Sequence, residues 1–189
     1  GQHPSHIYEM LIVCDVRDAC DILLPVYERT EGRDGFVSLE VSPELAHDTA
    51  GSIVEARRLW KAVDRPNLFI KSPGTREGVP AIETLLIEGI NVNITLLFSI
   101  ESYERVAHAH VRALERRMKE VAPMDAPVLL LGEAGTPVDQ IARRLHVQSG
   151  RADGPFVIAD CASARPGETG TALFGSGEGS GPHPGWLGT

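Results

Sequence analysis

The sequence predicts an α/β protein built around a parallel sheet. Three short segments, residues 36–41, 68–71 and 90–98, are expected to be strands because they are mostly apolar and are bounded by turn residues. The stretches between them carry apolar side chains at helical spacing. Strands that alternate with helices are typical of parallel sheets, because each helix returns the chain to the start of the next strand.

The first two helices are expected before and after the first strand. Residues 7–27 place apolar side chains on one stripe, and Asp15 could begin a second helix inside this segment. Pro43 is expected to open a helix that continues to about Val63, because proline is favoured in the first turn.

The next two helices follow the second and third strands. One is expected from about residue 76 to Glu88, where Gly89 can adopt the left-handed conformation that ends a helix. The other is expected to begin after Ser99, whose hydroxyl can cap it, and to continue to about Glu120.

The character of the chain changes after residue 120. We expect further strands at residues 128–131 and 156–159 with a helix at 138–147 between them. Residues 163–189 are rich in Gly, Ser, Pro and Thr, so we expect a mobile tail. The expected division is therefore a first domain at 1–120, a linker at 121–126 and a second segment at 127–189.

Composition excludes several kinds of protein. The net charge of −8 argues against a general nucleic-acid surface, which needs a clustered basic excess. No apolar run approaches the roughly 18 residues of a membrane span. Three cysteines without metal-site spacing favour reduced thiols in a cytoplasmic protein and no metal site. Gly1 in place of Met suggests an N-terminus that lies elsewhere.

Alternation along the strands gives the sheet one apolar and one polar face. The polar face should carry Ser38 and Glu40 from the first strand, Lys71 from the second, and Asn93 and Thr95 from the third. Four of them, Glu40, Lys71, Asn93 and Thr95, are expected late in their strands or in the C-terminal halves, which is the end where parallel sheets and barrels hold their sites. We therefore expect the polar faces to converge in a barrel or crevice.

A lysine in such a crevice favours a reaction with carbonyl compounds. Partial desolvation favours the neutral amine, which can attack a carbonyl and form a Schiff base. A nearby glutamate could hold a water molecule or move protons. Two plainer interpretations stay open: Lys71 is an exposed charge at a strand end, or Glu40 is its structural ion-pair partner.

Three strings resemble the middle of a transaldolase. Residues 34–43 (DGFVSLEVSP) look like the strand with the active-site glutamate of that family. Residues 67–83 (NLFIKSPGTREGVPAIE) resemble the strand and loop with its Schiff-base lysine. Residues 89–99 (GINVNITLLFS) are similar to its strand with an asparagine and a threonine. The resemblance covers about residues 6–120 and implies a partial TIM-type (β/α) barrel.

The resemblance implies an activity and roles for the polar residues. Transaldolases transfer a dihydroxyacetone unit between sugar phosphates of the pentose phosphate pathway and need no cofactor. Lys71 would be the nucleophile, Glu40 and Thr95 would hold the catalytic water, and Asn93 would bind the dihydroxyacetone moiety. Ser38 is a further candidate for substrate binding. The implied substrates are sedoheptulose 7-phosphate, fructose 6-phosphate, glyceraldehyde 3-phosphate and erythrose 4-phosphate.

Parts of the family pattern are not found in the chain. The family's first strand carries a general acid/base aspartate and its second a Thr-Ser-Asn-Pro motif, and neither precedes His6. The later strands with the phosphate-binding Ser and Arg do not follow Glu120. A barrel fragment exposes strand edges, so we expect it to self-associate.

Residues 126–189 resemble the start of the AAA+ domain of bacterial enhancer-binding activators. The strings that carry the resemblance include residues 126–136 (APVLLLGEAGT) and 140–146 (QIARRLH). The P-loop is degenerate, because Pro137 stands in place of its glycine and Val138 in place of its lysine. An incomplete α/β P-loop-like segment is implied.

Three hypotheses follow. The chain could be a transaldolase-like enzyme, a regulatory or protein-binding module without ATPase activity, or the product of a truncated or rearranged reading frame that joins two gene fragments. Transaldolase-like chemistry is the preferred function, and a joined pair of gene fragments is the preferred origin.

Overall fold

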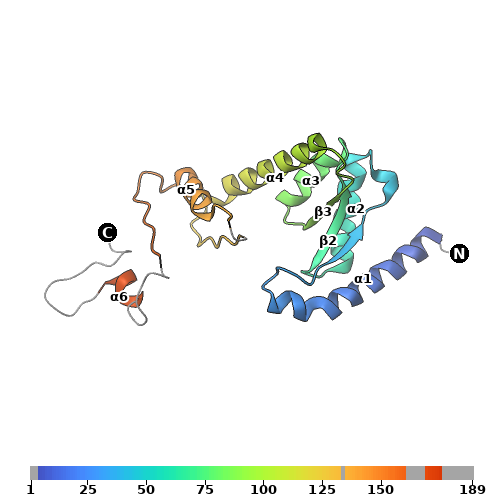
Figure 1. Cartoon of the computed structure of the whole chain (residues 1–189), viewed down its shortest axis with the longest axis horizontal. Helices are drawn as coiled ribbons and strands as arrows, with labels where there is room; N and C mark the ends of the chain where they lie inside the picture. Colours follow the sequence, from blue (N-terminus) through green and yellow to red (C-terminus); the bar gives the residue numbers. More distant parts are fainter. Residues whose placement is uncertain (1–3, 133–134, 161–168, 176–189) are drawn as a thin grey trace. The chain divides into compact units, whose positions relative to one another are not determined.

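The computed structural model describes residues 4–132, 135–160 and 169–175, and Figure 1 shows their helices and strands. The chain divides into two compact units, residues 1–118 and 119–189, each described by itself below. The first contains α1 (Pro4–Arg29), β1 (Val37–Glu40), the 3-10 turn η1 (Pro43–Leu45), α2 (Thr49–Val63), β2 (Leu68–Pro73), α3 (Gly78–Ile87), β3 (Val92–Thr95) and most of α4 (Ile100–Val121).

The three strands form a parallel sheet in the order β1-β2-β3. One face is apolar and covered by helices: Leu39, Leu68 and Ile70 are all buried on it. The α/β fold class expected from the sequence is confirmed, and so is the alternation of faces along the strands. The sheet is open, which is consistent with a fragment of a TIM-type barrel.

The main core lies between this face and the helices α1, α2 and α3. Its buried members are Cys20, Leu39, Val41, Ala56, Leu59, Val63, Leu68, Ile70, Leu85 and Ile90. Burial raises the pKa of the Cys20 thiol, so this cysteine serves as a small apolar side chain. A smaller cluster joins α3 to α4 through Val79, Ile82, Val106 and Ala109.

Helix α1 is one continuous helix, as Figure 1 shows. A separate helix beginning at Asp15 was expected as one option, and this expectation is wrong. The apolar stripe continues past Asp15, since Val13 and Val16 both pack against the main core. From the same helix, the Arg17 guanidinium donates to the carbonyls of Ala62 and Val63 and so satisfies acceptors at the end of α2.

The expectation of one helix from Pro43 to Val63 is only partly correct. The segment forms η1 first, and α2 starts at Thr49. Asp48 causes the new start, because its Oδ1 accepts from the Gly51 amide at 2.9 Å. Side-chain capping thus outweighs the proline signal.

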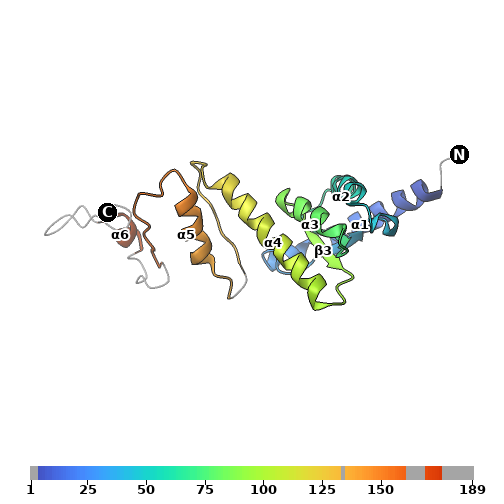
Figure 2. The same ribbon diagram turned by 90° about the horizontal axis from the view of Figure 1, so that it is seen from above.

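The sequence predicts the ends of the helices on either side of β3, but it makes the strand itself too long. Gly89 has φ +79° and ends the third helical segment as expected. The strand expected at residues 90–98 is confined to β3, since Leu96 has φ +60° and turns the chain away from the sheet. Ser99 then caps α4, because its hydroxyl oxygen accepts a hydrogen bond from the Ser102 amide at 3.1 Å. Figure 2 shows α4 as one uninterrupted helix.

The second unit contains α5 (Val138–Gln148) and α6 (Thr169–Phe174). The helix expected at residues 138–147 is confirmed. The strands expected at 128–131 and 156–159 are wrong, because the described residues there form no ladder. Leu129 and Leu131 are 80% and 85% exposed, which shows that apolar composition does not make a strand without a neighbouring strand to pair with.

Most of the tail expected at residues 163–189 lies outside the described residues. Helix α6 and Gly175 are the parts of it that the structure describes. Within the described ranges, no helix combines the length and the apolar character that crossing a membrane requires.

Asn67 provides a test of how the first unit is held together. This fully buried side chain donates to the carbonyls of Cys20 at 2.9 Å and Gly35 at 2.8 Å. We expect Asn67→Ala to lower the free energy of unfolding by about 2–3 kcal/mol, because it removes two hydrogen bonds to carbonyls in the buried interior. Urea denaturation followed by circular dichroism measures this.

Asn91→Ala is the matched control. Its amide makes longer bonds, at 3.4 Å to Pro66 and 3.2 Å to Leu68, from a partly exposed position. We expect a loss below about 1 kcal/mol. Equal losses in the two variants would contradict the proposed role of Asn67.

Candidate functional site

Three polar residues occupy one row across the sheet. The register pairs Glu40 with Lys71 and Lys71 with Asn93, so that the lysine of the middle strand stands between an acid and an amide. Side chains at paired positions of neighbouring strands project to the same side. The row faces away from the helices, because its neighbours Leu39 and Ile70 are buried beneath them.

Lys71 and Glu40 form an ion pair in this row. The Lys71 Nζ lies 3.6 Å from the Glu40 Oε2. Their side chains are 32% and 55% exposed, so the pair is open to solvent in this structure. This arrangement contains the structural ion pair that the sequence left open as an alternative, and it also leaves the Lys71 side chain partly exposed.

A second polar link crosses β2 just below the lysine. The Asn93 Nδ2 donates to the Ser38 Oγ at 3.1 Å. Ser38 is paired with Phe69, and Asn93 with Lys71, so this bond spans the middle strand between those two side chains. The structure thus brings four of the predicted residues together.

Thr95, the fifth predicted residue, lies one step further towards the C-terminal end of β3. It is paired with Pro73, and its carbonyl accepts from the Gly74 amide at 2.8 Å. Its side chain belongs to the same face as Asn93 by alternation. Thr95 therefore borders the row on the side of the loops that follow the strands.

The loops above the row are tied together by residues that the sequence did not single out. The Thr75 Oγ1 donates to the Ala46 carbonyl at 2.6 Å, which joins the loop after β2 to the loop after β1. The same oxygen accepts from the Gly78 amide at 3.0 Å. Nothing in the sequence links positions 29 residues apart, so only the structure reveals this tie.

A polar contact between two side chains lies beside this tie. The His47 Nδ1 and the Glu77 Oε2 lie 3.2 Å apart. A hydrogen bond from its own backbone N–H, and then the nearby His47 ring, hold the pKa of the Glu77 carboxyl below its ordinary value. Glu77 is therefore ionised at neutral pH, with the His47 ring beside its carboxylate.

Aromatic side chains pack at the other end of the strands. The ring centroids of Phe36 and Phe69 are 4.4 Å apart, and Tyr27 meets Phe36 edge to face at 5.2 Å. Phe69 shares the face of Lys71 by alternation. The row therefore has an aromatic cluster on one side and the loops on the other.

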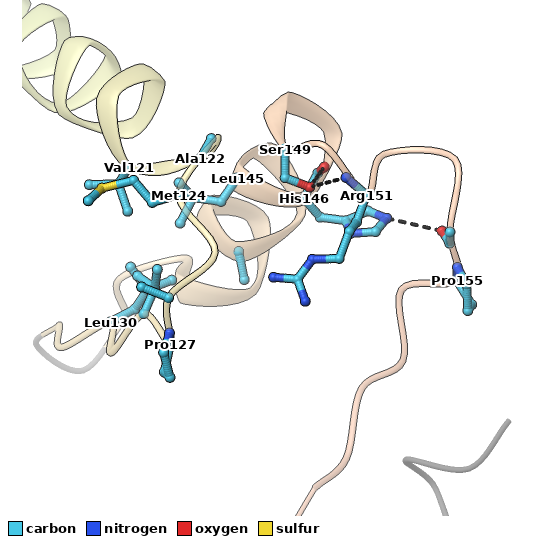
Figure 3. A pocket seen from close by; sticks show the side chains of 14 residues that line it. Val121, Ala122, Met124, Pro127, Leu130, Leu145, His146, Ser149, Arg151 and Pro155 are labelled. Atoms are coloured by element: carbon cyan, nitrogen blue, oxygen red, sulfur yellow. Dashed lines mark hydrogen bonds between the residues drawn. The ribbon is translucent and has the colours of Figure 1, made fainter.

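Each unit also contains a cavity. A groove of about 630 Å³ in the first unit follows β1 and is bordered by residues from α1, η1 and α2. A cavity of about 550 Å³ in the second unit lies between residues 121 and 155, where Figure 3 shows His146 and Arg151 among mostly apolar side chains. The described residues include no group of three His, Cys, Asp or Glu placed to hold a metal ion.

Comparison with known proteins identifies the family. The sequence profile of the transaldolase/fructose-6-phosphate aldolase family matches residues 1–136. The chain belongs to this family. The resemblance expected over residues 6–120 is therefore confirmed, and Lys71, Glu40, Asn93 and Thr95 all lie inside the matched segment.

Individual transaldolases are similar to this chain over part of their own length. The chain is 54% identical over 136 residues to the transaldolase of Thiobacillus denitrificans, which covers 70% of this chain and 38% of that protein. It is 57% identical over 114 residues to transaldolase 2 of Nostoc punctiforme, which covers 60% of this chain and 30% of that protein. The chain thus spans well under half the length of these relatives.

A second profile matches the C-terminal part. The sigma-54 interaction domain matches residues 105–182, which overlaps the transaldolase match at residues 105–136. The resemblance to activators of this kind is confirmed, although the described part of the segment contains helices and no strand.

Gly78 tests the geometry that positions the loop after Lys71. A Cβ at this position would lie 2.0 Å from the Pro73 carbonyl oxygen. We expect Gly78→Ala to speed up hydrogen exchange of the α3 amides by at least roughly tenfold, because the backbone must move to avoid the overlap.

Gly150→Ala serves as the control, since a Cβ there meets no atom within 4 Å. Mass-spectrometric hydrogen exchange should leave α3 unchanged in this variant. Unchanged exchange of α3 in Gly78→Ala as well would show that the close approach to Pro73 does not constrain the loop.

Proposed function

We propose that this chain carries the Schiff-base part of a transaldolase site, in which a dihydroxyacetone unit is transferred between sugar phosphates. The observation that supports this proposal is the row of Glu40, Lys71 and Asn93 across three parallel strands, in a chain of the transaldolase family. An amine flanked by an acid and an amide suits covalent chemistry at a ketone.

The covalent step uses the amine of Lys71. Its neutral form adds to the C2 carbonyl of a ketose phosphate, and loss of water from the carbinolamine gives an iminium ion. Cleavage of the C3–C4 bond then leaves its electron pair on the dihydroxyacetone unit. The C4 hydroxyl loses a proton, and the fragment that contains C4 departs as an aldehyde. The enamine attacks an acceptor aldehyde, and water releases the product from the lysine.

The neighbours of Lys71 have matching roles in this proposal. Glu40, 3.6 Å from the amine, and Thr95 hold the water that is lost and later returned. Asn93 hydrogen-bonds a hydroxyl of the dihydroxyacetone unit. Ser38 binds the same region, because it already holds the Asn93 amide.

The proposed substrate class is the one that the resemblance to transaldolases implies. The donors are ketose phosphates such as sedoheptulose 7-phosphate and fructose 6-phosphate, and the acceptors are glyceraldehyde 3-phosphate and erythrose 4-phosphate. The iminium ion itself accepts the electrons of the broken bond, so the proposal needs no metal or organic cofactor. The proposal includes a role in the pentose phosphate pathway and a cytoplasmic location, as the resemblance to transaldolases implies. The catalytic part corresponds to residues 1–120, joined by a linker at 121–126 to residues 127–189.

Borohydride trapping tests the proposal. We expect reduction in the presence of fructose 6-phosphate to add a sugar or dihydroxyacetone group to Lys71, because borohydride converts an iminium ion into a stable amine. Intact mass and peptide mapping locate the adduct.

Lys71→Met provides the control, with Lys61 on the exposed side of α2 as an internal reference for non-specific labelling. Labelling of both lysines to the same extent, or none on a folded protein, would overturn the proposal.

The sigma-54 profile supports a second candidate function. Residues 127–189 would then form a regulatory or protein-binding module that does not hydrolyse ATP. Helix α5 starts at Val138 directly after Gly135 and Pro137, so a helix N-terminus follows a glycine-containing loop as in a P-loop. The lysine that would contact the phosphates is replaced by Val138.

This second candidate predicts a negative and a positive result. ATP should cause no detectable phosphate release and no change in the tryptophan fluorescence of the chain, because neither a P-loop lysine nor a free amide at Pro137 is present. Purified sigma-54 should bind in calorimetry. Phosphate release above that of a heat-denatured sample would contradict the first point.

A further inference from the structure

The loop that follows β2 is bonded to the chain on both sides of that strand. The Gly74 amide donates to the Thr95 carbonyl at 2.8 Å, at the end of β3. The next residue, the half-buried Thr75, donates its hydroxyl to the Ala46 carbonyl at 2.6 Å, at the end of η1. Both bonds are made just beyond Lys71, so the loop joins the strand of the amine to its two neighbours.

The segment between Glu40 and Ala46 is short and bonded within itself. The Leu45 amide donates to the Ser42 carbonyl at 3.0 Å, and the Ala46 amide donates to the Pro43 carbonyl at 3.2 Å. These bonds close η1, which leaves little slack in the backbone. A displacement of Ala46 is therefore passed on to the end of β1.

Glu40 lies between two attachments to β2 and its loop. On one side, the Val41 amide donates to the Lys71 carbonyl at 3.2 Å. On the other, beyond η1, the Thr75 bond fastens the chain to the loop that continues from Lys71. The 3.6 Å contact between the Lys71 Nζ and the Glu40 Oε2 needs such support, because a partly exposed ion pair holds its own geometry only weakly.

The loop itself is tightly packed. A Cβ on Gly74 would lie 2.6 Å from the Leu97 side chain. The Thr75 oxygen also accepts from the Gly78 amide at 3.0 Å, at the start of α3. One hydroxyl thus serves as donor to the segment after β1 and as acceptor for the helix after β2.

Two other contacts join the same loop to the chain after η1. The Thr49 hydroxyl donates to the Glu77 carbonyl, and the His47 ring lies beside the Glu77 carboxylate. Both reach the start of α2. The Thr75 bond differs from them because it reaches Ala46, the residue that ends η1.

We infer that Thr75 is a positioning residue for the Lys71 amine. It acts through Glu40, because its bond to Ala46 holds the end of β1 where the Glu40 carboxylate lies beside the amine. The inference rests on the proposed function for the view that Lys71 and Glu40 are the reacting pair. The contact between them can be tested without a sugar.

Labelling of Lys71 relative to Lys61 measures this contact. Formaldehyde with cyanoborohydride methylates lysine amines through a Schiff base, and peptide mapping quantifies each lysine in the full 189-residue chain. We expect Glu40→Gln to change the ratio of the two lysines by at least about threefold, because it removes the charge beside one amine. Thr75→Val keeps the shape of the side chain but loses the hydroxyl, so it should change the ratio in the same direction.

Three further variants separate positioning from folding. Thr75→Ser keeps a hydroxyl that can donate to Ala46 and should restore the wild-type ratio. Thr84→Val removes a hydroxyl that donates to the Pro80 carbonyl at 2.9 Å within α3, and it should leave the ratio unchanged. In a Glu40→Gln background, Thr75→Val should add nothing, because the carboxylate that it positions is gone. If Thr75→Val does not fold, Thr75→Cys, with its weaker donor, is compared with Thr75→Ser instead.

Three results would overturn the inference. The first is an unchanged ratio in folded Thr75→Val or in Glu40→Gln. The second is an effect of Thr75→Val that persists in the Glu40→Gln background, which would mean that Thr75 acts on the start of α3 alone. The third is an equal change in Thr75→Ser, which would exclude the hydroxyl as the cause. Borohydride trapping with fructose 6-phosphate is scored separately, so a missing sugar adduct would overturn the proposed function and leave the formaldehyde comparison readable.

Discussion

The in-register burial of one sheet face is the constraint on which the first unit depends. Leu39 and Ile70 must both reach the helices, and this requirement fixes how β1 and β2 are aligned. A slip by one residue would turn every side chain to the opposite face. The positions of Glu40, Lys71 and Asn93 in one row follow from that packing, so apolar side chains that take no part in chemistry determine which polar groups meet.

Much of this arrangement could be predicted from the sequence, because it depends on local periodicity. Alternation placed Ser38, Glu40, Lys71 and Asn93 on one face, and the structure brings them together. The predicted helix from Pro43 failed for a reason that is also local, since Asp48 competes as a cap. The tie between Thr75 and Ala46 could not be predicted, because it joins loops whose proximity exists only after the strands have paired.

The second unit shows where periodicity is insufficient. Residues 128–131 have the composition of a buried strand, yet Leu129 and Leu131 remain exposed. A strand is stabilised by its neighbours, whereas a helix such as α5 completes its hydrogen bonds within itself. This difference explains why the helix at residues 138–148 formed as expected and the flanking strands did not.

The row around Lys71 is also asymmetric. A carboxylate lies on its β1 side and a carboxamide on its β3 side, with the aromatic rings towards one end and the loops towards the other. A planar trigonal carbon attached to this amine would therefore have two faces in unlike surroundings. Addition to that carbon would be directed to one face. The stereochemistry of the product would then follow from the order of the three strands in the sheet.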